Sequence, residues 1–138
     1  MEIRYPALVE PQPEGGFFVQ FVDLPDTFTE GGTMEQALFH AVEVLSAMLD
    51  VKMDDGADIP PPSQDVSGAV YIAPDAKTQA ALLVRQARGE MSLATLARAM
   101  ETSWPATQRL ENPNHWPSLK SLDRAASALG KRLVLVLE

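Results

Sequence analysis

The first third of the chain alternates short apolar runs with turn-forming residues. Residues 2–9 and 15–22 are rich in aliphatic, β-branched and aromatic side chains, and residues 11–16 between them include two prolines and two glycines. This pattern predicts a β-hairpin. In the second strand only Gln20 is strongly polar, so both faces are expected to be at least partly covered. A turn at 23–26 and a third short strand at 27–29 should follow.

A helix is predicted from residue 34 to about Met53. Thr33 and Gln36 have the spacing of a capping box, in which the threonine accepts a hydrogen bond from the amide of residue 36 and the glutamine reaches back. Apolar side chains then recur at intervals of three and four. They are Met34, Ala37, Leu38, Ala41, Leu45, Met48 and Leu49. The prolines at 60–62 cannot be helical, and residues 69–73 are predicted to form the last strand of this α+β unit.

From Asp75 onward the pattern is helical, with helices predicted at 75–88, 92–100, 104–112 and 118–129. Ser92, Ser103 and Ser118 are the expected N-caps of the last three helices. Gly89 and Gly130 follow the ends of the first and last helices. The fold class is therefore α+β, a sheet-plus-helix domain followed by an all-α domain.

The chain ends in five consecutive apolar residues, which predict a strand buried on both faces. They are Leu133, Val134, Leu135, Val136 and Leu137. The helical half offers no neighbouring strand. Pairing with the same strand of a second subunit is the simplest way to satisfy the backbone groups of this strand. The alternative is that the strand docks on the sheet predicted in the first half of the chain.

The length of 138 residues allows one ordinary domain or two small ones. We place the boundary after Ala73, which gives domains 1–73 and 74–138. Apolar residues make up 46% and charged residues 22%, typical of a soluble globular protein. The absence of cysteine excludes disulfides and thiolate chemistry. With no signal peptide and no apolar stretch of membrane-spanning length, the sequence favours a cytoplasmic protein without membrane contact.

The net charge of −8 hides an asymmetry between the two halves. Residues 1–67 carry 13 acidic and 2 basic side chains, a net −11, whereas residues 68–138 carry 6 acidic and 9 basic ones, a net +3. An acidic front half repels nucleic acid and attracts a basic protein, and a mildly basic back half tolerates phosphate. The alternative explanation is that the charged side chains only keep the surface hydrated, are unevenly distributed along the chain and contact no partner.

Residues 96–111 have the spacing of a helix-turn-helix, with the small Ala97 where two helices would cross. Glu101 stands at the turn position usually filled by glycine. The second helix would place its N-terminal residues in the major groove. The predicted DNA-binding residues are Ser103, Trp104, Pro105, Gln108 and Arg109, and Ala106, Thr107 and Leu110 should point inward.

Each predicted contact has a chemical reason. Arg109 can donate two hydrogen bonds to a guanine and Gln108 can pair with an adenine, while Ser103 and the helix N-terminus can hold phosphate. Trp104 could contact a thymine methyl group or cover the domain's own core. A helical domain that packs only against protein remains the alternative to DNA binding.

The other polar clusters favour no catalytic, metal or cofactor site. Asp54, Asp55 and Asp58 lack the bidentate Glu and the mid-loop Gly of a calcium loop, so a solvated helix end is favoured. His40 and His115 lie in different halves, and neither has an Asp or Ser at triad-like spacing. The glycine pairs belong to turns and not to a phosphate-binding loop. We therefore predict no enzyme.

The order of motifs resembles that of the HicB antitoxins over nearly the whole chain, in the form that carries a C-terminal helix-turn-helix domain. The matching stretches are Gly-Gly-Phe-Phe-Val-Gln-Phe-Val-Asp-Leu-Pro-Asp at 15–26, Thr-Glu-Gly-Gly-Thr at 29–33, Glu-Gln-Ala at 35–37, Ala-Val at 41–42, Ile-Pro-Pro-Pro-Ser at 59–63 and Ala-Leu-Gly-Lys-Arg-Leu at 128–133. Each motif is short, and their specificity lies in the order.

The resemblance implies a front half with a partial RNase H-like fold that has lost nuclease activity. That half would occlude a small basic HicA-type toxin, an mRNA-cleaving ribonuclease. It also implies a homodimer that represses its own operon through operator DNA, with further pairing into tetramers left open. From position and charge we predict that Asp23, Asp26 and Glu30 contribute to the toxin-binding rim.

Two other functions remain open at this point. One is a stand-alone helix-turn-helix regulator whose front half senses a small ligand. The other is an RNase H-like hydrolase that uses carboxylates such as Asp23, Glu43 and Asp50 to bridge metal ions.

Overall fold

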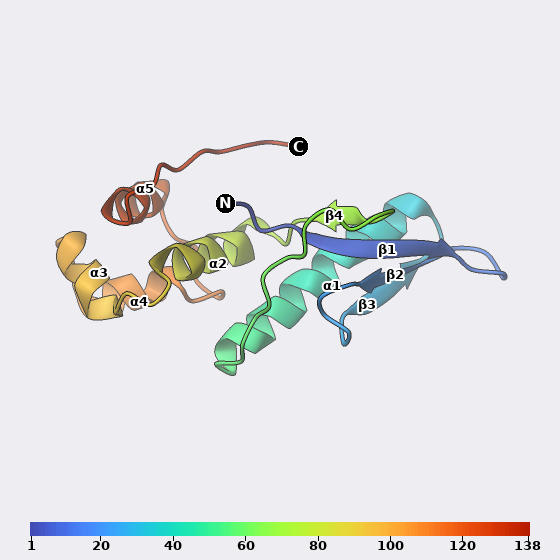
Figure 1. Ribbon diagram of the computed structural model, residues 1–138, viewed down its shortest axis with the longest axis horizontal. Coiled ribbons are helices and arrows are strands. Elements are labelled where there is room, and N and C mark those ends of the chain that lie inside the picture. Colours follow the sequence, from blue (N-terminus) through green and yellow to red (C-terminus); the bar gives the residue numbers. More distant parts are fainter. The chain divides into compact units, whose positions relative to one another are not determined.

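The computed structural model describes all 138 residues and divides into two compact units, residues 1–76 and 77–138 (Figure 1). We call them unit 1 and unit 2. A four-stranded antiparallel sheet and five helices make the chain a mixed α/β protein, which confirms the predicted class at that level. None of the helices combines the length and apolarity needed to cross a lipid bilayer.

The sheet of unit 1 contains β1 (Tyr5–Pro11), β2 (Phe17–Phe21), β3 (Phe28–Gly31) and β4 (Val70–Ile72) in the order β3-β2-β1-β4. The predicted hairpin is confirmed, with Val9 opposite Val19 in the antiparallel register. The predicted third and last strands are confirmed as β3 and β4, which pair with β2 and β1.

Helix α1 (Met34–Asp54) covers one face of this sheet (Figure 1). Thr33 caps it as predicted, and Gln36 reaches back to accept from the Gly32 amide at 3.1 Å. The helix starts so close to β3 that a Cβ on Gly31 would lie 2.6 Å from the Ala37 Cα, so a side chain there is excluded. The fully buried helix residues are Ala37, Ala41, Leu45 and Leu49.

The segment between α1 and β4 has little regular structure and is held by side chains of the sheet. The Tyr5 hydroxyl donates to the Pro60 carbonyl at 2.7 Å, and the Tyr71 hydroxyl donates to the Ser63 carbonyl at 3.0 Å. Asp23 accepts from the Ser63 amide at 2.8 Å and also from its hydroxyl. The proline-rich segment is therefore fixed without a hydrogen-bond ladder of its own.

Unit 2 is built from short helices with the predicted caps. They are α2 (Ala76–Arg88), α3 (Leu93–Ala99), α4 (Trp104–Leu110) and α5 (Leu119–Ala128). Ser92, Ser103 and Ser118 each accept from the amide three residues on. A small apolar core holds the helices together, formed by Val84, Leu96, Met100, Leu110 and Ala125.

The predicted C-terminal strand is absent from the single chain. Residues 131–138 form neither helix nor strand, and the sheet of unit 1 consists of β1 to β4. The side chains of Val134, Leu135, Val136 and Leu137 are 63 to 100% exposed, and Leu133 is half-buried. A strand needs a partner for its backbone groups, and one chain supplies none.

We expect the stability of unit 1 to fall at alkaline pH because of Tyr5. Burial, reinforced by the negative charge of Asp23, raises the pKa of Tyr5 from 10.0 to about 12. A raised folded-state pKa stabilises the fold below the unfolded pKa, and that contribution is lost as pH rises through the folded one. The loss between about pH 10 and 12 should amount to about 2 kcal/mol.

Urea unfolding at about pH 9 and about pH 11.5, followed by circular dichroism, measures this loss. Tyr5→Phe should cost about 1 kcal/mol at the lower pH, because the bond to Pro60 is lost. The same variant should show a shallower alkaline decline than the wild type. An equally steep decline in both proteins would assign the alkaline sensitivity to another group.

Candidate functional site

The segment from α3 to α4 is a pair of short helices joined by a tight turn. Glu101, at the turn position usually filled by glycine, adopts φ 54, which lies in the left-handed region that glycine enters most easily. The Thr102 amide then donates to the Ala97 carbonyl at 3.0 Å, which closes the end of α3. Ala97 is 5% exposed, and its small side chain suits a close crossing of the two helices.

Helix α4 presents one polar face to solvent. The five residues predicted to contact DNA are all exposed: Ser103, Trp104, Pro105, Gln108 and Arg109. Thr107 and Leu110 are buried as predicted, and the Thr107 hydroxyl donates to the Ser103 carbonyl at 3.0 Å. Ala106 is only half-buried, because it lies at the edge of the inward face. Trp104 is 46% exposed, so it does not fill the core of unit 2.

A nearly buried ion pair joins α2 to the end of α4. Arg88 Nε lies 2.5 Å from Glu111 Oε2, and its Nη2 lies 2.9 Å from Oε1, a bidentate geometry. The two side chains are 18% and 10% exposed. The hydrogen bond to Glu111 raises the pKa of Arg88, so the guanidinium stays charged. Sequence reasoning missed this pair, because 23 residues separate its members and no local pattern links α2 to the end of α4.

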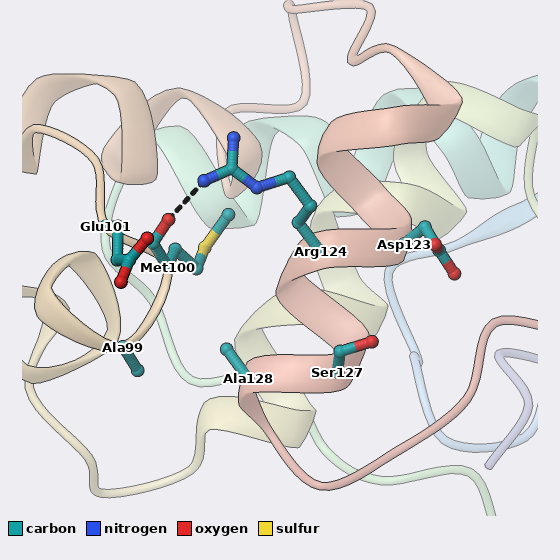
Figure 2. Close-up of a pocket in the computed structure, with 7 residues that line it drawn as sticks. All are labelled: Ala99, Met100, Glu101, Asp123, Arg124, Ser127 and Ala128. Atoms are coloured by element: carbon teal, nitrogen blue, oxygen red, sulfur yellow. Dashed lines mark hydrogen bonds between the residues drawn. The ribbon is translucent and has the colours of Figure 1, made fainter.

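The turn between α3 and α4 is also held from α5. The Arg124 guanidinium donates to the Met100 carbonyl across a hollow of about 370 Å³ (Figure 2). Figure 2 shows Arg124 pointing from α5 toward the turn that carries Met100 and Glu101. The lining residues are Ala99, Met100, Glu101, Asp123, Arg124, Ser127 and Ala128. Because the guanidinium bonds to the protein's own backbone, Arg124 braces the turn.

The three acidic residues predicted for the toxin-binding rim have separate surroundings in unit 1. Asp23 is half-buried and bonded to Ser63. Asp26 is exposed and lies 3.1 Å from Lys52 Nζ, and this hydrogen bond lowers the pKa of Asp26. Glu30 is exposed and accepts from Gln12 at 3.0 Å. Asp26 and Glu30 are thus open to a partner, while Asp23 mainly fixes the proline-rich segment.

No three acidic or histidine side chains gather closely enough to hold a metal ion. This finding covers the aspartates at 54, 55 and 58 and the carboxylates Asp23, Glu43 and Asp50. His40 Nδ1 lies 2.9 Å from the Glu30 carbonyl, so this histidine links α1 to β3.

The chain is similar over almost its whole length to known antitoxins. The family model described as the HicB-like antitoxin of bacterial toxin–antitoxin systems matches residues 4–79. Antitoxin HicB of Escherichia coli K12 is 34% identical over 137 residues, which cover 98% of this chain and 99% of that protein. Antitoxin HicB 2 of Photorhabdus laumondii is 33% identical over 134 residues, which cover 97% and 96% of the two chains.

We expect Arg88→Met to lower the free energy of unfolding of unit 2 by about 2 to 4 kcal/mol, because it leaves a mostly buried carboxylate without its partner. Urea unfolding followed by tryptophan fluorescence measures this, since Trp104 and Trp116 both lie in unit 2.

Arg85→Met is the matched control, because it removes the same charge from α2 without breaking an ion pair. The double variant Arg88→Met with Glu111→Leu removes both charges and should recover part of the stability lost in Arg88→Met. Equal stability of the Arg88 and Arg85 variants would show that the ion pair does not stabilise unit 2.

Proposed function

The chain belongs to the HicB-like antitoxins of bacterial toxin–antitoxin systems and is not an enzyme, and we propose that it neutralises a HicA-type toxin and represses its own operon. Unit 1 would have a partial RNase H-like fold and would bind the small basic mRNA-cleaving ribonuclease. Unit 2 would bind operator DNA through a helix-turn-helix formed by α3 and α4. Both activities would take place in the cytoplasm.

The division of charge is the observation that carries this proposal. Residues 1–67 have a net charge of −11, and residues 68–138 have a net charge of +3. A strongly acidic unit steers toward a basic partner and competes with the RNA that such a toxin binds. A weakly basic unit with an exposed polar helix face tolerates the phosphate backbone of DNA.

The exposed face of α4 supports the DNA-binding part of the proposal. Ser103, Gln108 and Arg109 are exposed together, and the buried Thr107 and Leu110 fix the opposite face against the core. In a helix-turn-helix the N-terminal part of the second helix contacts base edges. The bonds from Arg88 to Glu111 and from Arg124 to Met100 hold that helix and its turn in place.

The exposed C-terminal residues support a dimer. Leu133, Val134, Leu135, Val136 and Leu137 would pair with the same residues of a second copy about a two-fold axis. An apolar segment whose side chains reach 100% exposure favours association. Such a dimer would set two recognition helices roughly 34 to 36 Å or a multiple apart, as a pseudo-palindromic operator requires.

Arg109→Ala should weaken operator binding by about 1 to 3 kcal/mol and relax base preference at one position, because a bidentate contact to guanine is lost. Fluorescence anisotropy with operator DNA measures the affinity. Arg85→Ala, outside α4, removes the same charge and should change the affinity less. Unchanged affinity and unchanged sequence preference in the Arg109 variant would exclude this residue from base recognition.

A chain truncated after Gly130 should be monomeric and should keep its toxin binding through unit 1. It should lose most operator affinity, because the two half-sites are no longer engaged together. Light scattering gives the mass, and anisotropy and a pull-down with a HicA-type toxin give the two affinities. If the truncated chain stays dimeric and binds the operator normally, the C-terminal segment has another purpose. If it fails to bind the toxin, the assignment of toxin binding to unit 1 is wrong.

A further inference from the structure

The face of the sheet opposite α1 is only partly covered. Ala7, Val19 and Phe21 point to the buried side and are at most 1% exposed. Side chains alternate along a strand, so the residues between them point to the other side. There Pro6 lies opposite Tyr71, whose hydroxyl bonds to the segment at 63–66. That segment covers the start of β1 and leaves the rest of this side uncovered.

The strand register arranges the uncovered side chains in two rows across β1, β2 and β3. Leu8 pairs with Gln20, which pairs with Phe28. Two residues along, Glu10 pairs with Phe18, which pairs with Glu30. We call Leu8, Glu10, Phe18, Phe28 and Glu30 the open face.

The open face combines an apolar centre with flanking carboxylates. Phe28 is 52% exposed and Leu8 is 39% exposed, and the ring centroids of Phe18 and Phe28 lie 6.0 Å apart. Glu10 and Glu30 are exposed on either side of Phe18. An arginine or lysine can lay its stem along an aromatic ring while its charged head pairs with a carboxylate.

The charge of unit 1 disfavours a second copy as the occupant of this face. Residues 1–67 contain only two cations, Arg4 and Lys52, and both already lie beside carboxylates, 3.3 Å from Glu2 and 3.1 Å from Asp26. Two such units brought face to face would repel each other. A basic protein surface complements the same charges.

We propose that the open face is the toxin-binding surface of unit 1, and this inference rests on the function proposed above. The toxin contributes arginine or lysine side chains that lie along Phe18 and Phe28. Their charged heads pair with Glu10 and Glu30. The contact is thus centred on the sheet. Of the three predicted rim residues, Asp23, Asp26 and Glu30, only Glu30 belongs to the open face.

The first test compares two charge reversals in the full-length chain. Glu10→Lys with Glu30→Lys changes the open face, and Glu43→Lys with Asp58→Lys makes the same change of net charge on α1 and the loop after it. Biolayer interferometry with a catalytically inactive variant of the cognate HicA-type toxin gives both rate constants. Both variants should slow association alike, because steering follows net charge, but only the open-face variant should dissociate about 30-fold faster.

The second test compares two exposed phenylalanines. Phe28→Ser removes the apolar centre of the open face, and Phe39→Ser removes a side chain that is 64% exposed on α1. The first should dissociate about 10- to 30-fold faster from the toxin, and the second should behave as the wild type. Near-UV circular dichroism checks that both variants are folded. Light scattering reports whether either substitution changes the oligomeric state.

The outcomes separate this inference from the function on which it rests. Toxin binding by the wild type with equal dissociation from the open-face and control variants would overturn the surface and leave the antitoxin function standing. Faster dissociation only from the Glu43/Asp58 or Phe39 variants would place the toxin on α1. Loss of a dimer in the Phe28 variant, with toxin binding intact, would show that the face pairs two copies. A wild-type chain that does not bind the toxin would overturn both proposals.

Discussion

A single helix can bury only one face of a four-stranded sheet, and this constraint shapes unit 1. Helix α1 lies so close to β3 that there is no room for a side chain at Gly31 beside Ala37. The proline-rich segment then covers the start of β1, fixed by Tyr5, Asp23 and Tyr71. The remaining part of the second face has neither a helix nor a segment of unit 1 over it, so the apolar side chains of Leu8 and Phe28 stay exposed there.

Unit 2 depends on anchoring of a different kind. Helix α4 has seven residues, too few for a helix to be stable by itself in water. Its orientation therefore comes from three attachments: the buried Thr107 and Leu110, the ion pair from Arg88 to Glu111 and the bond from Arg124 to the preceding turn. A recognition surface needs side chains held on a rigid support. The exposed residues of α4 are held from the opposite side of the helix.

Local signals in the sequence were enough for most of the elements. The serine caps, the glycines after the helices and the turn residues of the hairpin act within a few positions, so the boundaries at Ser92, Ser103 and Ser118 could be predicted. The exposed face of α4 followed from helical periodicity alone. The ion pair between Arg88 and Glu111 could not be predicted, because it depends on how α2 and α4 pack.

The C-terminal segment and Asp23 show two other limits of sequence reasoning. Five apolar residues at 133–137 predict burial, but the pattern does not say which surface buries them, and one chain leaves most of them exposed. The charge of Asp23 predicts a contact with a partner. Its bonds to Ser63 arise from a contact 40 residues away, which no local pattern reveals.

The arrangement of charge separates the two kinds of association proposed for this chain. On the open face Glu10 and Glu30 stand about 10 Å apart, two strand spacings, and their repulsion is relieved when a cationic side chain enters between them. An identical face adds to that repulsion. Residues 133–137 carry no charge, so nothing electrostatic opposes the meeting of two copies there. On the proposals made above, the acidic surface would select a different protein, and the neutral segment would serve self-association.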